Sequence, residues 1–176
     1  MTIRELDRKR DRAAVEQIDT SFQTEVVFEV VTTARAISLV ERTLDAPITK
    51  RYSIGEVFAP WASWSAGWVC DDDGVRGFAT VEHEPWHQRV NLWFLYISPS
   101  HRGRGVGRAL LERVEAHARS VGASHVWLET SSVNVPGVRF YERCGYALCG
   151  ADRTYYGAYM PGETAIYLAK PIMLGA

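Results

Sequence analysis

The sequence is poor in cysteine and has no long apolar run, and each shortage excludes a class of protein. Its three cysteines, Cys70, Cys144 and Cys149, have no metal-ligand spacing and leave one thiol unpaired, which argues against a disulfide scaffold and a structural zinc site. This cysteine usage is typical of a reducing compartment, so we expect a cytoplasmic protein. No stretch approaches the length of a membrane-spanning helix, and the N-terminus alternates charges where a secretory signal would be apolar. We therefore expect no membrane partner.

Excess charge of either sign is also missing. With 20 basic and 21 acidic residues, the formal net charge is −1, so a sequence-independent attraction to nucleic acid is not expected. The five histidines lack ligand spacing, and we expect no catalytic metal. A hydrophobic content of 47% in 176 residues is ordinary for a soluble globular protein of one domain. We therefore predict a single domain over residues 1–176.

Hydrophobic periodicity and turn residues predict an α+β or mixed α/β domain. Near the N-terminus we expect a strand at 2–6, a helix at 7–18, a hairpin at 25–31 and 36–42, and then a loop at 45–59 with a short helical turn. Further strands are expected at 68–70, 75–82, 89–98, 125–130, 146–149 and 164–169, and helices at 105–121 and 135–143. Asp71 to Gly74 is a strong hairpin signal, because an Asp-Gly pair accepts positive φ.

The most informative stretch runs from Leu92 to Leu111, where a strand enters a glycine-rich loop that opens into a helix. Such a loop exposes backbone N–H groups at a helix N-terminus, where the helix dipole favours an anion. Arginine side chains around the same point suit a pyrophosphate. The residues concerned are Gly103, Gly105 and Gly107, with Arg102, Arg104 and Arg108. The stretch predicts a site for a phosphate-bearing cofactor, and a glycine turn without a ligand is the alternative.

Two common phosphate loops fit poorly. A Walker A loop ends in Gly-Lys-Ser/Thr, whereas this loop ends in Gly107-Arg108-Ala109. The dinucleotide fingerprint requires a small residue where Leu110 stands. Glu129 lies about twenty residues further on, as that fingerprint requires, but too little chain follows for a second nucleotide-binding half.

The pattern Arg-x-x-Gly-x-Gly at 102–107, preceded by Ile97-Ser98-Pro99, resembles motif A of the GNAT superfamily of N-acetyltransferases. A second segment, Asn134 to Tyr146, is similar to that family's Asn-x6-Tyr segment followed by Gly-Tyr. The resemblance implies acetyl-CoA as co-substrate, with no metal. It also implies the GNAT fold, a central twisted mixed sheet of about six to seven strands flanked by helices, here with a β-rich N-terminal insert.

The resemblance further implies a cofactor site. Backbone groups of Tyr96, Ile97 and Ser98 would bond the pantetheine and the thioester carbonyl, and Asn134 would bond the pantetheine arm. The pyrophosphate would be held by the loop, at His101, Arg102, Gly103, Arg104, Gly105, Val106, Gly107 and Arg108.

Acetyl transfer to an amine also requires acid–base groups. Tyr141 stands seven residues after Asn134, where the family has its general acid, and a tyrosine packed against the sheet is the alternative. The amine must lose a proton before attack. Glu129 is the first candidate for base or substrate anchor, and Glu82 and Glu84 follow. Each could instead be a solvated or ion-paired carboxylate, and water could relay the proton.

Segments 19–31, 45–50 and 154–168 are similar to the streptothricin acetyltransferases of this superfamily, which acetylate an amine of a cationic antibiotic. This likeness implies a polycationic acceptor surrounded by acidic and aromatic side chains, namely Glu82, Glu84, Glu129, Glu163, Tyr155 and Tyr156. The leading expectation is an N-acetyltransferase acting on such a small molecule. A protein N-terminal, lysine or polyamine acetyltransferase and a non-catalytic acyl-CoA-binding module are the alternatives. Segment 25–42 and the last strand could also form a homodimer.

Overall fold

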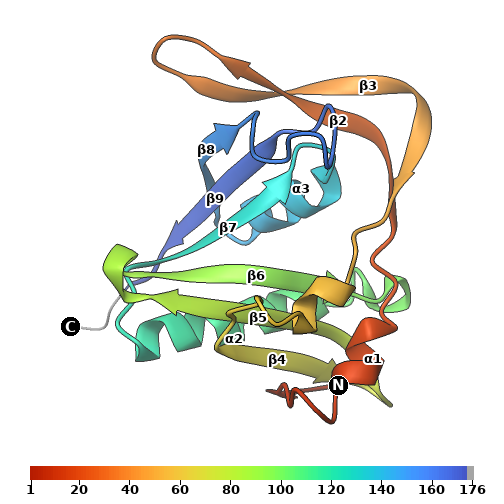
Figure 1. Ribbon diagram of the computed structural model, residues 1–176, viewed down its shortest axis with the longest axis vertical. Coiled ribbons are helices and arrows are strands. Elements are labelled where there is room, and N and C mark those ends of the chain that lie inside the picture. Colours follow the sequence, from red (N-terminus) through yellow and green to blue (C-terminus); the bar gives the residue numbers. More distant parts are fainter. Residues whose placement is uncertain (174–176) are drawn as a thin grey trace. The chain divides into compact units, whose positions relative to one another are not determined.

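The computed structural model describes residues 1–173, and the chain divides into two compact units (Figure 1). The first unit contains Met1–Ser21, Arg51–Trp127 and the segment that begins at Pro171, and the second contains Phe22–Lys50 and Leu128–Lys170. Each unit is therefore built from stretches that are distant in the sequence. None of the helices in the described part of the chain is long and apolar enough to cross a membrane.

The first unit is built on an antiparallel meander, with registers such as Glu5↔Trp68 and Phe78↔Tyr96. Its strands are β1 (Thr2–Glu5), β4 (Ala66–Asp71), β5 (Val75–Glu84) and β6 (Arg89–Ile97). Its helices are α1 (Arg12–Glu16) and α2 (Val106–Ser120), with short 3-10 turns η1 (Gly55–Phe58), η2 (Pro85–His87) and η3 (Pro99–His101). Helix α2 packs on β4, β5 and β6 through an apolar stripe that includes Leu110 and Val114.

The second unit contains the hairpin of β2 (Phe22–Thr32) and β3 (Ile37–Lys50), which forms a separate two-stranded sheet. Its other elements are β7 (His125–Ser131), which enters it from the first unit, α3 (Val135–Arg143), β8 (Ala147–Asp152) and β9 (Ala165–Pro171). Strands β8 and β9 are antiparallel. The hairpin is the predicted β-rich insert. Seven strands make one sheet in the order β1-β4-β5-β6-β7-β9-β8, as predicted.

The first helix is shorter than predicted, with five residues in place of the span 7–18. The Asp7 carboxylate accepts hydrogen bonds from the backbone N–H groups of Lys9 and Arg10, at 2.9 and 2.8 Å. Such a local side-chain turn competes with the helix, and the helix therefore begins only at Arg12.

Strand β3 is longer than predicted, because it continues to Lys50 through a stretch expected to be loop. The ladder passes from Val26↔Thr43 to Thr24↔Ile48, so residues 44–47 of β3 bulge outward. Pro47 falls within this bulge, where its missing N–H is not required by the ladder. A proline that suggested a loop is thus accommodated inside a strand.

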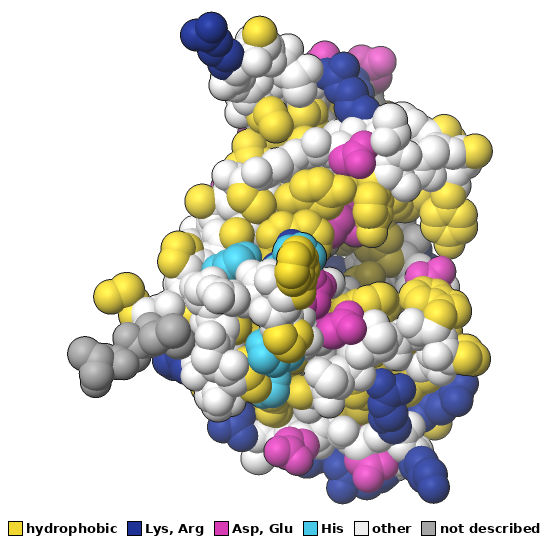
Figure 2. Space-filling model, turned by 60° about the vertical axis from the view of Figure 1, so that its left-hand side comes forward, with side chains coloured by type: hydrophobic (Ala, Val, Ile, Leu, Met, Phe, Trp, Pro, Cys, Tyr) yellow, Lys and Arg dark blue, Asp and Glu magenta, His cyan; other side chains and the backbone are white. Residues whose placement is uncertain are grey.

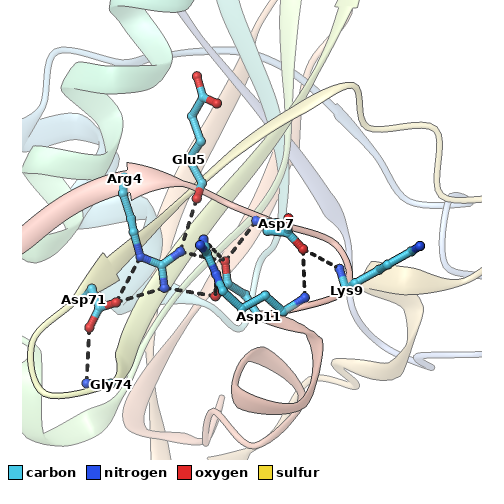
Figure 3. Close-up of polar contacts among 8 residues, drawn as sticks. Arg4, Glu5, Asp7, Lys9, Asp11, Asp71 and Gly74 are labelled. Atoms are coloured by element: carbon cyan, nitrogen blue, oxygen red, sulfur yellow. Dashed lines mark hydrogen bonds and ion pairs between the residues drawn. The ribbon is translucent and has the colours of Figure 1, made fainter.

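A buried carboxylate ties the N-terminal strand to its neighbours (Figure 3). Asp11 is 2% exposed and accepts bonds from both terminal nitrogens of Arg4, at 2.7 and 2.9 Å. Arg4 also pairs with Asp71 at 2.9 Å, and the Asp7 N–H donates to Asp11. The bonds from Arg4 and Arg10 outweigh desolvation, so the pKa of Asp11 is well below its usual range.

Candidate active site

The glycine loop of the first unit has the backbone shape that the sequence predicts. Gly103 and Gly105 lie at φ +73° and +84°, and Gly105 is the N-cap of α2. Only glycine adopts this left-handed conformation at little cost. A Cβ at either position would meet no heavy atom within 4 Å, so the loop borders open space. Glycine is therefore needed for its conformation rather than for its small size.

The loop also presents the charge and donors that a pyrophosphate needs. No side chain caps the N-terminus of α2, and the first N–H groups of a helix lack intrahelical acceptors. Arg104 and Arg108 are exposed beside these N–H groups. Open space, unsatisfied N–H donors and two exposed cations together fit a doubly charged pyrophosphate.

Arg102, the first residue of the motif, has a different environment from the other two loop arginines. Its guanidinium donates to the carbonyls of Ile97, Ser21 and Asp19, at 3.0, 2.6 and 3.3 Å. Desolvation lowers its pKa. In this structure Arg102 holds the loop to the end of β6 and to the chain segment before β2. The sequence motif alone could not distinguish this bracing contact from a phosphate contact.

The strand residues before the loop are fixed by the meander. Tyr96 and Ile97 pair with Phe78 and Gly77 of β5. The Ser98 N–H then donates to the carbonyl of Arg76 at 2.8 Å. Gly77 is required here, because a Cβ would lie 2.8 Å from the Ile97 side chain and 3.0 Å from the Tyr96 carbonyl oxygen. The strand end is thus held firmly before the chain turns into the loop.

In the second unit, Asn134 caps helix α3. Its Oδ1 accepts from the Gly137 N–H at 3.1 Å, and its Nδ2 donates to Thr130 Oγ1 at 2.9 Å. A Cβ on Gly137 would approach Asn134 to 2.3 Å, so the glycine makes room for the cap. The same amide that the resemblance assigns to the pantetheine arm therefore also begins this helix.

Tyr141 is buried on α3, with 9% of its surface exposed. Its ring lies between Phe140 and Tyr146, at centroid distances of 5.4 and 5.8 Å. The Tyr146 N–H donates to the Tyr141 carbonyl at 3.0 Å. Packing thus fixes the ring direction, which a positioned acid requires.

Glu129 is the carboxylate with the most unusual environment. It stands near the end of β7, and the Tyr156 hydroxyl donates to it. Desolvation raises the pKa of Glu129, the bond from Tyr156 opposes this change, and the charge of Glu163 adds to it. A carboxyl whose pKa is raised toward neutrality is suited to accept a proton from an ammonium.

Glu163 is already paired with a cation of the protein. Lys50, at the end of β3, forms an ion pair with it, and Ser131 donates to the same carboxylate. Lys50 and Glu163 are 113 residues apart, and no local pattern signals their contact. A cavity of about 670 Å³ lies beside this pair, lined by the β2–β3 hairpin and residues 161–164.

The remaining acidic and aromatic candidates differ in the groups that they contact. In the first unit, Glu84 pairs with Arg89 and His87, at 2.9 and 3.0 Å, and these contacts lower its pKa against desolvation. Glu82 accepts hydrogen bonds from two uncharged donors, the Ser63 hydroxyl and the Trp93 indole N–H. In the second unit, Tyr155 packs edge-on against Tyr156 and Tyr167, and desolvation raises its pKa.

Comparison with known proteins agrees with this geometry. Residues 37–146 match the acetyltransferase (GNAT) family. The streptothricin acetyltransferase of Streptomyces lavendulae is 37% identical over 173 residues, covering 93% of this chain and 92% of the relative. The likeness therefore includes segments outside the family match.

Solved acetyltransferase structures are also similar to this chain over nearly its whole length. The crystal structure of nourseothricin acetyltransferase has a TM-score of 0.86 at 36% identity and covers 98% of both chains. A candidate streptothricin acetyltransferase from Bacillus anthracis, determined with acetyl coenzyme A, is 22% identical with a TM-score of 0.81, over 97% of this chain and 98% of that one. The second likeness concerns the fold alone. Family match, near full-length identity and fold agree, and the chain belongs to the GNAT family as an acetyl-CoA-dependent N-acetyltransferase.

Proposed function

We propose that the enzyme acetylates a primary amine of a cationic small molecule of the streptothricin type. The observation that carries this proposal is the 37% identity to the Streptomyces lavendulae enzyme along 93% of the chain. The likeness to nourseothricin acetyltransferase at 36% identity supports it. Carboxylates without a cationic partner, such as Glu82 in the first unit, suit such an acceptor.

The donor is held by the first unit in this proposal. The N–H groups at the start of α2, with Arg104 and Arg108, bind the pyrophosphate, while Arg102 keeps the loop in shape. Backbone groups of residues 96–98 hold the pantetheine and the thioester, and Asn134 of the second unit contributes to the pantetheine arm. When bound, acetyl-CoA supplies the activated acetyl group.

The amine attacks directly in a ternary complex. Its nitrogen forms the C–N bond as the C–S bond of the thioester breaks, and the electron pair leaves on sulfur. Glu129 receives the proton of the acceptor's ammonium, either directly or through water, because its raised pKa suits that transfer. Tyr141 protonates the departing thiolate. Glu82, the next candidate for the base, binds the acceptor in this proposal and takes no part in the proton transfer.

Further acidic and aromatic groups bind the acceptor. Tyr156 orients Glu129 by its hydrogen bond, and Tyr155 offers an exposed ring to a cation. Glu163, neutralised by Lys50, acts mainly by raising the pKa of Glu129. Glu84, paired with Arg89, contributes a weaker negative field.

We further propose that the enzyme forms a dimer and works in the cytoplasm. Two copies associate through the β2–β3 hairpin, where Val31, Ile37, Val40 and Ile48 are each more than a third exposed. The enzyme works in a reducing compartment, the cytoplasm, in keeping with its three cysteines, all within the described residues, being free thiols.

A thiol-release assay with a panel of amines tests the acceptor. The panel contains streptothricin, a polyamine and a peptide with a free N-terminus, each at equal concentration with saturating acetyl-CoA. Fastest CoA release, by kcat/KM, is expected with streptothricin. Faster release with the peptide or with the polyamine would overturn the proposed acceptor and leave the acetyltransferase activity standing.

A further inference from the structure

In the first unit, the Glu82 carboxylate is held by two neutral hydrogen-bond donors. Glu82 Oε2 accepts from Ser63 Oγ at 2.9 Å and from Trp93 Nε1 at 3.0 Å, both neutral donors. Among residues 1–173, no Lys, Arg or His side chain forms an ion pair with Glu82. Other acidic side chains, such as Glu84 and Glu163, do have such partners. Neutral donors therefore hold this carboxylate in place.

One indole donates a hydrogen bond to this carboxylate, and a second indole packs against the first. Trp61 is 57% exposed, and its ring lies 6.4 Å from that of Trp93, which itself donates to Glu82. Figure 2 shows hydrophobic side chains standing at the surface next to acidic ones. An exposed indole that packs against the indole bonded to a carboxylate can attract an organic cation in two ways, through its π face and through the nearby charge.

The segment that carries Trp61 and Ser63 is anchored by the two residues that follow Ser63. Trp64 is buried, its Nε1 donates to the Val57 carbonyl at 2.6 Å, and the Arg8 guanidinium lies 3.6 Å above its ring. The Ser65 N–H then donates to the Val81 carbonyl at 2.8 Å, next to Glu82. These contacts fix the approach of Ser63 to Glu82 before any ligand binds, which lowers the entropic cost of binding.

We propose that Trp61, Ser63, Glu82 and Trp93 form a subsite for an alkylammonium group of the acceptor other than the amine that is acetylated. The inference rests on the proposed polycationic acceptor. It assigns the recognition of the acceptor's second positive charge to this subsite. Glu82 then determines specificity and is not the base. The two roles differ kinetically, because a base acts on every amine, whereas the subsite acts only on acceptors with a second cation.

Steady-state kinetics of Glu82→Gln and Trp61→Ala test the subsite. Glutamine retains an oxygen for Ser63 and Trp93, and Trp61 is exposed enough to be removed without disturbing the core. For streptothricin, KM is expected to rise about 2- to 30-fold, with kcat within about two-fold. For an amine with a single positive charge, KM is expected to stay unchanged. Trp61→Phe should restore most of the loss.

The matched control is Trp86→Ala, which removes a still more exposed indole, at 88%, whose ring lies 6.3 Å from that of His87. It should leave KM for streptothricin within about two-fold of the wild type, because Glu84, the carboxylate two residues before it, is paired with Arg89. A fall in kcat for both acceptors in Glu82→Gln would identify a base and overturn the subsite. Unchanged KM for streptothricin would also overturn it.

Binding of tetramethylammonium chloride gives a readout that needs no acetyl transfer. Tryptophan fluorescence is titrated against sodium chloride at matched ionic strength, with a saturable change expected in the wild type and lost in Glu82→Gln. If the probe binds through Glu82 but streptothricin is not acetylated, the acceptor proposal fails and the cation site stands. If streptothricin is acetylated and the probe does not bind, the subsite is refuted.

Discussion

At the scale of single residues, the environment of each ionisable side chain separates groups that look alike in the sequence. Glu82, Glu84, Glu129 and Glu163 are four glutamates, yet Glu84 and Glu163 form ion pairs with Arg89 and Lys50, whereas Glu82 and Glu129 accept hydrogen bonds from neutral groups. Only Glu129 combines burial with a raised pKa. Pairing of this kind depends on distant parts of the chain and is invisible to a local motif.

Replacing Tyr141 by phenylalanine should lower kcat about ten-fold or more with little change in acetyl-CoA affinity, because the proton donor for the thiolate is lost while the packed ring remains. Stopped-flow or steady-state thiol release measures kcat. Tyr146→Phe, which removes a hydroxyl from the adjoining ring, is the matched control. An unchanged kcat in Tyr141→Phe would contradict its acid role.

The pH profile should report on Glu129. Tyr156→Phe removes a hydrogen bond that lowers the pKa of Glu129, so this pKa should rise further. The base must be ionised to accept a proton, and the acidic limb of the kcat/KM profile should therefore move to higher pH. Tyr159→Phe, at a ring that is 74% exposed, should leave the limb in place. A limb that does not move in Tyr156→Phe would exclude Glu129 as the titrating base.

The buried Asp11 cluster makes a prediction about stability. Asp11→Asn removes the buried one of the two carboxylates that pair with Arg4 and should cost roughly 3 kcal/mol of unfolding free energy at pH 7. Glu16→Gln, which breaks the exposed pair with Arg12, should cost only about 0.5 kcal/mol. Urea unfolding measures both values. Similar losses in the two variants would contradict the argument from burial.

The sign of its pH dependence follows from the lowered pKa of Asp11 in the folded state. Its stabilisation is present above the unfolded-state value, about 3.9, and is lost as pH falls below it toward the folded-state pKa. The difference between wild type and Asp11→Asn should therefore shrink between pH 4 and pH 2, taken as an approximate window.

At the scale of elements, we predict that the start of α2 decides whether the donor can bind. Gly105→Ala places a Cβ at φ +84°. The resulting backbone strain costs about 1–2 kcal/mol of free energy, or the glycine loop changes its conformation to avoid it. The KM for acetyl-CoA should rise about 5- to 30-fold. Gly122→Ala imposes the same kind of strain at φ +71° beyond the other end of the helix, and should leave this KM unchanged. Equal effects would mean that strain alone, and not the glycine loop, is responsible.

Local patterns predicted most elements, and the exceptions have physical causes. The hairpin, the meander, α2 and α3 follow from periodicity and turn residues, which act over a few residues. The short α1 and the long β3 were missed, since a carboxylate that bonds the backbone replaced a helical turn and a bulge accommodated Pro47. Both outcomes depend on competing interactions that a pattern of apolar positions does not encode.

At the scale of the whole molecule, the net charge of −1 gives little long-range attraction for a polycation. Attraction must therefore come from individual carboxylates at short range, where screening by salt is weak. The same scale determines assembly. The exposed apolar side chains of the β2–β3 hairpin predict a dimer by sedimentation velocity, because burying them stabilises the pair.

Val40→Lys, at a side chain 49% exposed on β3, should shift the sedimenting species to the monomer. Thr43→Lys adds the same charge on the same strand without removing an apolar group, and should leave more dimer. A wild-type monomer at all concentrations would exclude this mode of association.

From the sequence alone, the glycine loop predicted a phosphate-bearing cofactor, and the resemblance of 102–107 and 134–146 to the GNAT motifs implied acetyl-CoA, because such motifs are patterns of the chain itself. The sequence also determined the fold class, through the order of its periodic segments. Only the tertiary structure decided which carboxylates form ion pairs with a cation of the protein. It also placed the Arg102 guanidinium against backbone carbonyls. Ionic pairing and desolvation depend on residues as far apart as Lys50 and Glu163, and that proximity exists only once the chain has folded.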